Sequence, residues 1–179
     1  LFPAQYSFAK DTSAVAALQA MVDRATTELT KSGVTTSTGK LNAQQLLTMA
    51  SIIQAEGKTE DFAKISRVII NRLEKGMPLQ MDSTVHYIKR VRGEIFLSKS
   101  STLINSPYNT YKKYGLPPGP IGNPGLNAMK AAVAPAAGDW LYFITVAPQD
   151  TRFTSSLEEF NTWKVLYKKN LRAGKFEDN

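Results

Sequence analysis

The 179-residue sequence predicts a single α+β domain that is mostly helical and carries a small antiparallel sheet. Two observations lead to this fold class. Several segments repeat apolar residues at helical spacing and are bounded by capping residues or glycines. In contrast, residues 140–146 have the aromatic and β-branched composition of a strand. The hydrophobic fraction of 42% is ordinary for a globular domain, and no apolar run approaches the roughly 18 residues of a membrane span.

The N-terminal part of the chain predicts an extended or strand-like segment over residues 1–8, followed by a long helix. The helix runs from Ala14 to Ser32, with Thr12 or Ser13 as its cap and Gly33 as its stop. Residues 34–40 are polar and predict a loop. The predicted core-facing side of the helix has apolar residues three or four positions apart, namely Val15, Leu18, Val22, Ala25 and Leu29.

A second helix is predicted from Ala43 to Glu56, capped by Asn42 and ended by Gly57. Its apolar stripe consists of Leu46, Met49, Ala50 and Ile53.

Two further helices are predicted after it. The first runs from about residue 60 to residue 75, has acidic residues in its first turn and ends at Gly76. The second is short and covers residues 83–90, with Asp82 or Ser83 as its cap.

Residues 106–124 are rich in Pro, Gly, Tyr and Asn and predict a long ordered loop, which is a common place for function. Asn123 and Pro124 are expected to be the N-cap and first residue of a helix that carries Leu126, Met129 and Val133.

The C-terminal part predicts a hairpin and a helix. The strand at residues 140–146 is expected to pair with residues 152–154 across a turn. Residues 155–158 then form a capping box for a final helix that extends to about Arg172.

Composition excludes several kinds of chemistry. The sequence has no cysteine and a single histidine, His86, so disulfides, thiol nucleophiles and multi-histidine metal sites are excluded. Acid–base chemistry therefore falls mainly to the 15 Asp and Glu residues. The net charge of +7 favours an anionic partner such as nucleic acid, anionic lipid or wall polymer. The basic residues match no nucleic-acid motif, and a solvated basic surface is the more common situation.

Glu56 is the leading candidate for a general acid. It follows Ile52 and Ile53 at helical spacing, so it extends an apolar stripe, and it stands at a helix C-terminus. Burial and the helix dipole would both raise its pKa, as a general acid near neutral pH requires. An exposed last-turn glutamate remains the alternative. Asp82, taken alone, is more simply a helix cap, and the tyrosines of the long loop suit either packing or sugar binding.

Several ordered motifs resemble the endolytic murein transglycosylases, the MltG or YceG-like family. Residues 1–6 (LFPAQY) are similar to the family's "LFPDTY", and residues 49–56 (MASIIQAE) to its "LASIVxxE". Residues 68–85 match "INRL…GMxLQxDxTV", and residues 106–121 match "SPYNTY…GLPPGPI". The resemblance covers nearly the full length. It departs where the family often has histidine, at residues 151–153 and 159–161, and where many members have an acid, at Gln54.

The resemblance implies a catalytic domain spanning residues 1–179 and a lytic reaction on peptidoglycan. Glu56 would cut the β-1,4 bond between N-acetylmuramic acid and N-acetylglucosamine inside strands, leaving 1,6-anhydro ends. The family also implies an upstream membrane anchor and a LysM-like domain outside this chain, and an extracytoplasmic position. No cofactor or metal is implied. The partners expected are glycan strands, with cell-wall synthases as candidates, and not nucleic acid; the membrane would be reached only through the anchor.

Around Glu56 we expect one groove lined by substrate-binding residues from two distant matched motifs. They are Gln80, Asp82, Thr84, Tyr108, Asn109 and Thr110. Two other functions stay open. A lysozyme-type hydrolase would need a second carboxylate such as Asp82, and a wall-binding module would keep the groove without chemistry.

Overall fold

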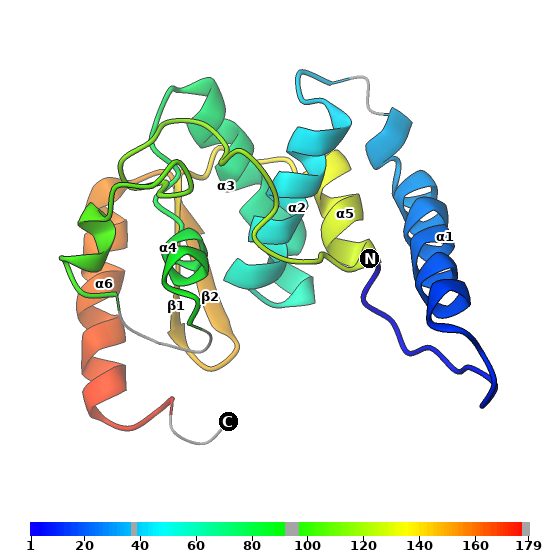
Figure 1. The fold of residues 1–179 in the computed structure, drawn as a ribbon. Coiled ribbons are helices and arrows are strands. Elements are labelled where there is room, and N and C mark those ends of the chain that lie inside the picture. Colours follow the sequence, from blue (N-terminus) through cyan, green and yellow to red (C-terminus); the bar gives the residue numbers. More distant parts are fainter. Residues whose placement is uncertain (37–38, 92–96, 177–179) are drawn as a thin grey trace.

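The computed structural model describes residues 1–36, 39–91 and 97–176. Its described part is α+β and mostly helical, with a two-stranded antiparallel sheet, as predicted. In Figure 1 a central group of helices separates the first helix from the hairpin and the last helix. None of the described helices has the length and apolar character needed to cross a membrane.

The core forms where three helices meet: α2 (Ala43–Glu56), α3 (Phe62–Glu74) and α5 (Leu126–Val133). A 3-10 turn at Thr59–Asp61 leads into α3. The predicted bounds of α2 are confirmed, because its start is fixed by a reciprocal capping box between Asn42 and Gln45. The apolar stripe predicted for α2 is buried in the core, in which Leu46, Met49, Ala50, Ile52, Ile53, Ile65, Ile69 and Met129 are nearly inaccessible.

The first helix, α1 (Ala14–Ser32), has the predicted bounds, with Ser13 as its cap and Gly33 in the left-handed conformation at its end. Its predicted core face is wrong in the first half of the helix. Val15, Leu18 and Val22 are 77%, 53% and 46% exposed. The reason is that α1 packs on the core mainly with its C-terminal turns, against α5 and the 3-10 turn Val34–Thr36. Residues 1–8 form no strand.

Two predicted helix starts are wrong because tertiary bonds replace local caps. The short helix α4 (Asp82–Lys89) has Met81 at its N-cap position, and the Met81 side chain makes no capping hydrogen bond. Similarly, α5 begins at Leu126 after Gly125 rather than at Pro124. The Gly125 N–H donates to the Gln54 side chain of α2, 3.0 Å away, which fixes the end of the preceding loop.

The predicted hairpin is confirmed as β1 (Tyr142–Ala147) and β2 (Asp150–Thr154), which pair antiparallel with an irregularity between Thr145 and Ala147. The last helix, α6 (Leu157–Arg172), packs along β1. Its N-cap is Ser156, one residue later than predicted, with its side chain accepting from the Glu159 N–H at 3.2 Å. Thus β1 and α6 form one body beside the helical core (Figure 1).

Candidate active site

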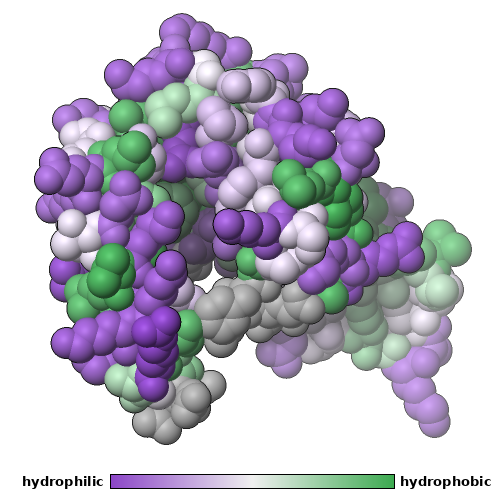
Figure 2. Space-filling view, turned by 90° about the vertical axis from the view of Figure 1, so that its left-hand side faces the viewer, coloured by the Kyte–Doolittle hydropathy of each residue, from purple (hydrophilic) through white to green (hydrophobic). Residues whose placement is uncertain are grey.

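Glu56 is the last residue of α2 and lines a cavity of about 570 Å³ between the core and α6. We call this cavity the Glu56 hollow. Its lining comes from α2, α3, the start of α4 and the segment before it, the loop that carries Tyr111, β1 and α6. The lining residues are Glu56, Arg72, Gln80, Met81, Asp82, Tyr111, Tyr142, Phe143, Ile144, Leu157, Phe160, Asn161, Lys164, Tyr167 and Lys168. Figure 2 looks onto the α6 side of the molecule and shows a depression near the middle of the face, with hydrophilic residues along part of its rim.

The Glu56 residue is half-buried, and its carboxyl group lies deep enough for burial to dominate its titration. Burial raises the pKa of the Glu56 carboxyl, and the nearby charge of Asp82 raises it further. The Ser83 hydroxyl and backbone N–H and the charge of Arg72 lower the same pKa, but burial is the largest effect. The net rise keeps Glu56 protonated to a higher pH than an ordinary glutamate, which is what a general acid needs.

The same carboxylate is also the acceptor for the start of α4. The Ser83 backbone N–H, in the first turn of α4, donates to Glu56 Oε1 at 3.0 Å. Helix N-termini carry unpaired N–H groups and a partial positive charge, so this contact favours the ionised form of Glu56. Burial therefore favours the protonated form of Glu56, and the hydrogen bond from the Ser83 N–H favours its carboxylate.

Asp82 lies in the same hollow and accepts a hydrogen bond from the Tyr111 hydroxyl. Burial, and then the bond to Asp82, raise the pKa of Tyr111, so its phenol stays protonated and remains a donor. The two alternatives for Asp82 from sequence were a helix cap and a groove residue. In the structure its carboxylate faces Tyr111 and it is the first residue of α4, so it does not act as the cap.

Arg72 of α3 also lines the Glu56 hollow and holds two neighbouring chain segments in place. Its guanidinium donates from Nε to the Leu141 carbonyl at 2.6 Å and from Nη1 to the Leu79 carbonyl at 2.5 Å. The guanidinium carbon also lies 5.4 Å from the centre of the Tyr142 ring. These contacts join α3 to the segment that precedes Asp82 and to the segment entering β1. Burial lowers the pKa of Arg72, although an arginine stays cationic in such a site.

The α6 side of the hollow is cationic and aromatic. Phe160, Lys164 and Lys168 follow one another at four-residue spacing on one face of the helix, and Tyr167 extends it. These α6 residues, Arg72 and Tyr142 were not predicted from the sequence, whereas Tyr111 is one of the loop tyrosines expected to serve packing or sugar binding. A helical face at 157, 160, 161, 164, 167 and 168 can be read from the sequence, but its position opposite Glu56 cannot.

The structure brings Gln80 and Asp82 together with Glu56 in one hollow. It places the Thr84, Asn109 and Thr110 side chains in the interior, where each is at most 1% exposed. Thr110 Oγ1 accepts from the Met81 N–H at 2.9 Å and lies 2.9 Å from the Thr84 hydroxyl. These bonds hold in place the segment that carries Gln80 and Asp82, which line the hollow. Sugar contact by Thr84, Asn109 and Thr110 stays a prediction.

Asn109 and Tyr108 have similar supporting contacts. The Asn109 amide donates to the carbonyls of Thr102, in the 3-10 turn Ser101–Leu103, and of Ile104, at 3.0 and 2.7 Å. The Tyr108 ring packs against that of Tyr87 with 4.9 Å between centres, and it is not in the lining of the Glu56 hollow.

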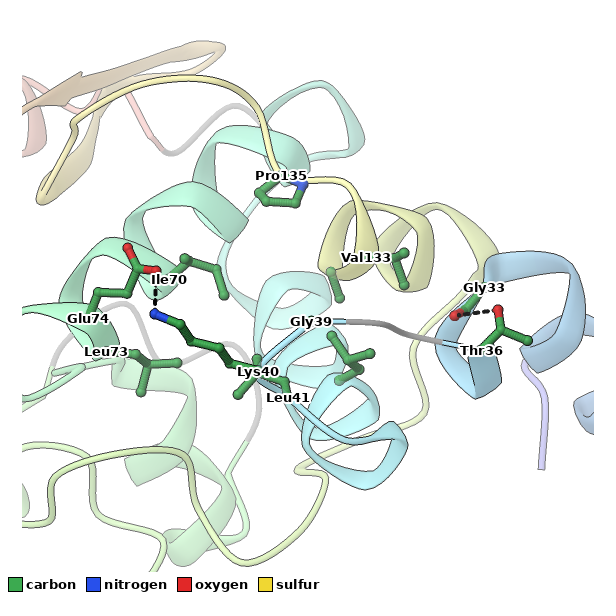
Figure 3. Close-up of a pocket in the computed structure, with 12 residues that line it drawn as sticks. Gly33, Thr36, Gly39, Lys40, Leu41, Ile70, Leu73, Glu74, Val133 and Pro135 are labelled. Carbon is green, nitrogen blue, oxygen red and sulfur yellow. Dashed lines mark hydrogen bonds and ion pairs between the residues drawn. The ribbon is translucent and has the colours of Figure 1, made fainter.

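A different cavity, of about 640 Å³, lies between α2, α3 and α5 (Figure 3). Its walls are mostly apolar, including Ile70, Leu73 and Val133, and its charged groups are Lys40 and Glu74, which pair at 3.5 Å. Both side chains of that pair are exposed, at 88% and 51%. This cavity therefore lacks a buried acid. Within the described residues, no group of three or more His, Cys, Asp or Glu side chains could hold a metal ion.

Comparison with known proteins identifies related sequences. Residues 1–165 match the family model described as the YceG-like family. The chain is 40% identical over 169 residues to the endolytic murein transglycosylase of Bacillus subtilis strain 168, covering 93% of this chain and 47% of that protein. It is 37% identical over 149 residues to the endolytic murein transglycosylase of Streptococcus pneumoniae D39, covering 80% of this chain and 27% of that protein.

A solved structure has the same fold. The crystal structure of a yceG-like protein from Listeria monocytogenes superimposes with a TM-score of 0.70 at 38% identity, covering 90% of this chain and 53% of that one. The chain therefore spans about half, or less, of the length of these relatives.

Proposed function

The chain belongs to the YceG-like family, and from that premise we propose that it is the catalytic domain of a peptidoglycan lytic transglycosylase with Glu56 as its acid and base. The observation that supports this most is the position of Glu56. It ends the buried helix α2, opens into the Glu56 hollow, and combines a raised pKa with a hydrogen bond from the first turn of α4. The similar proteins named endolytic murein transglycosylase are longer than this chain, so the activity is proposed for this domain.

The proposed reaction uses one carboxyl group twice. Protonated Glu56 donates its proton to the oxygen that joins C1 of N-acetylmuramic acid to N-acetylglucosamine, and the C1–O bond breaks. The muramyl C6 hydroxyl then attacks C1, and Glu56, now a carboxylate, takes the hydroxyl proton. A 1,6-anhydro ring forms, no water is consumed, and the enzyme regains its starting protonation. The attacking hydroxyl belongs to the sugar itself, so proximity makes it an efficient nucleophile.

The two influences on Glu56 match the two halves of this cycle. Burial favours the protonated acid that begins the reaction. The Ser83 N–H and the N-terminus of α4 stabilise the carboxylate that exists between the two proton transfers. A carboxyl group with only one of these influences would be a poorer catalyst for one of the two steps.

A lysozyme-type hydrolase is the competing function, because Asp82 lies in the same hollow and supplies a second carboxylate. In that reaction Asp82 would act as nucleophile or base, and water would appear in the product. The hydrogen bond from Tyr111 to Asp82 favours a fixed, supporting carboxylate over a nucleophile, because the donor reduces the basicity of the oxygen it bonds. A binding module without catalysis is disfavoured by the raised pKa of Glu56.

The proposed substrate places the domain on the extracytoplasmic face of the membrane, where peptidoglycan is found. An upstream membrane anchor, a LysM-like domain and contact with cell-wall synthases remain predictions from the resemblance. The proposed step needs no metal or organic cofactor, since both proton transfers are made by Glu56.

Product mass tests the function. Purified glycan strands are incubated with the full-length, membrane-anchored protein, and the ends of the products are analysed by mass spectrometry. We expect 1,6-anhydro-N-acetylmuramic acid ends produced by cuts inside strands. Reducing ends that carry one added water, with no anhydro ends, would establish the hydrolase instead.

Glu56→Gln is the diagnostic variant, since it keeps the shape of the side chain and removes the transferable proton. It should lower the rate at least about 10²-fold. The matched control is Glu60→Gln on the exposed turn before α3, which should cut at the wild-type rate.

A further inference from the structure

A second polar cavity adjoins the Glu56 hollow. It has a volume of about 630 Å³, within the roughly 300–1,000 Å³ of ordinary ligand sites. We call it the Ser83 hollow, and the residues of its lining that matter here are Gln54, Ala55, Ser83, His86, Tyr87 and Asn123. Its lining meets that of the Glu56 hollow at two points in the sequence. Ala55 lines one cavity and Glu56 the other, and Ser83 lines one and Asp82 the other. The hydrogen bond between Glu56 and Ser83 therefore lies at the boundary between the two cavities.

Two buried polar atoms in this lining have no partner among the described residues: Ser83 Oγ and His86 Nε2. Ser83 is only 9% exposed. Its backbone N–H is bonded to Glu56, and its hydroxyl lies near the same carboxylate and lowers its pKa without making a hydrogen bond of normal geometry. Buried polar groups in folded proteins almost always have partners, so two orphans one helical turn apart beside one cavity indicate a ligand.

A second serine in the same lining shows the contrast. Ser51 Oγ donates to the Thr48 carbonyl at 2.7 Å and accepts from the Ile121 N–H at 2.9 Å, so it is fully used by the fold. Ser83 Oγ makes no such contact, although it is comparably buried. Apart from its position near the Glu56 carboxylate, the Ser83 hydroxyl has no hydrogen-bond partner within the described residues, and a bound ligand would supply one.

The chemistry of the lining fits a neutral sugar. Among the described residues, no carboxylate lines the cavity, and Arg90 is the charged residue in its lining. The amides of Gln54 and Asn123 can bond hydroxyl or acetamido groups, and Gln54 keeps its NH₂ end available because its Oε1 already accepts from Gly125. The Tyr87 ring, 43% exposed and packed on Tyr108, offers a flat apolar surface of the kind on which a pyranose ring stacks.

We propose that the Ser83 hollow binds an N-acetylhexosamine unit next to the bond that Glu56 cuts, with the Ser83 hydroxyl and the His86 imidazole as its buried hydrogen-bonding groups. This inference rests on the proposed function, because cutting inside a strand requires sugar units on both sides of the acid. One strand would cross the boundary at Ser83, with one side in each cavity. Binding energy from the unit in the Ser83 hollow would then help to position the scissile oxygen at Glu56.

His86 gives a direct test, because it is the only histidine in the sequence and its imidazole signals need no assignment in an NMR spectrum. The chitin tetramer of N-acetylglucosamine is titrated into the Glu56→Gln protein, in which cleavage is removed. We expect a saturable shift of the His86 ring resonances. A His86 signal that stays in place up to millimolar tetramer would overturn the proposal. The proposal would also be wrong if free stem peptide moved the signal and the tetramer did not.

Ser83→Ala, made in the same background, separates binding from folding. It keeps the backbone N–H bonded to residue 56 and removes a hydroxyl with no partner, so folding should be unaffected. Tetramer affinity measured from the His86 shift should fall about three- to tenfold, as expected for one lost hydrogen bond. The matched control is Ser155→Ala on the exposed turn before α6, which should bind as before. Equal affinities for the two variants would contradict the role of Ser83.

This test can fail independently of the proposed function. A protein that makes anhydro ends but shows no His86 response would keep the function and lose the second sugar site. A His86 response in a protein that makes no anhydro ends would keep the sugar site and lose the reaction.

Discussion

The Ser83 backbone N–H donates a 3.0 Å hydrogen bond to Glu56 Oε1 and so joins the end of α2 to the first turn of α4. No side chain at Met81 caps α4, and the carboxylate of Glu56 takes that role from a different helix. The candidate catalytic group is therefore also part of the scaffold. Its protonation state is set by a competition between burial, which raises its pKa, and the helix terminus, which lowers it.

The first prediction concerns stability and pH. Burial raises the pKa of Glu56 above its ordinary value of 4.5, so the folded state binds the proton more tightly than the unfolded state. Well below pH 4.5 the carboxyl is neutral in both states. As pH rises through the folded-state pKa, wild type must bury a charge and its free energy of unfolding falls. Glu56→Gln lacks that charge, and its amide oxygen can still accept from Ser83. The variant should therefore gain stability relative to wild type as pH rises from about 4 to 8.

Thermal melts of both proteins across this pH range would measure the difference. Glu60→Gln is the control, since it makes the same substitution at an exposed position outside the Glu56 hollow. A variant that loses stability relative to wild type toward neutral pH would show that the bond to Ser83 outweighs burial.

The second prediction concerns Tyr111. Tyr111→Phe removes the hydroxyl that donates to Asp82 and keeps the ring in its packing place. Hydrogen bonds to charged groups contribute about 1.5–3 kcal/mol, so a stability loss of this order at most is expected. If Asp82 works as an oriented carboxylate near Glu56, kcat should fall several-fold while KM changes less. Tyr114→Phe, in an exposed side chain, is the control. Unchanged kcat in Tyr111→Phe would mean that the orientation of Asp82 is irrelevant to the reaction.

The third prediction concerns Thr110 and distinguishes a structural role of its hydroxyl from direct contact with the substrate. Its Oγ1 accepts from the Met81 N–H and lies 2.9 Å from the Thr84 hydroxyl. Thr110→Val leaves the buried Met81 N–H without its acceptor, while the Thr84 hydroxyl keeps its bond to the Met81 carbonyl. The expected loss is about 1–3 kcal/mol in the free energy of unfolding. Thr110→Ser keeps the hydroxyl and should lose much less. Denaturant unfolding of both variants measures this. A Val variant as stable as the Ser variant, but weaker in strand binding, would instead favour direct contact with sugar.

Local signals explain which parts of the fold could be predicted from sequence. The bounds of α1 and α2 were predicted correctly because their ends carry their own caps, Ser13 and Asn42. The starts of α4 and α5 were predicted wrongly because their terminal groups are organised by α2, through Glu56 and Gln54. A distant acceptor leaves no local pattern, so the nearest Asp or Asn looked like the cap.

The candidate site shows the same division. Glu56, Gln80 and Asp82 could be proposed from matched motifs, and the structure brings them into one hollow. Arg72 looked like an ordinary helix residue, and its contacts with the carbonyls of Leu79 and Leu141 depend on chain segments 7 and 69 residues away. The wall formed by α6 depends on how the hairpin places that helix opposite the core, which periodicity alone does not specify.

The last prediction tests the exposed face of α1, where the sequence-based prediction of a core face is wrong. Val15 and Leu18 are 77% and 53% exposed, so the double variant Val15→Ser/Leu18→Ser loses little burial on folding and should change the free energy of unfolding by no more than about 0.5 kcal/mol. Leu29→Ser, in the same helix but packed against the core, is the matched control and should cost more than about 1 kcal/mol. Denaturant titrations of the isolated domain would compare them. A loss in the double variant as large as that in Leu29→Ser would mean that the first turns of α1 are covered in solution, and sedimentation of the wild-type domain would then show whether a second copy covers them.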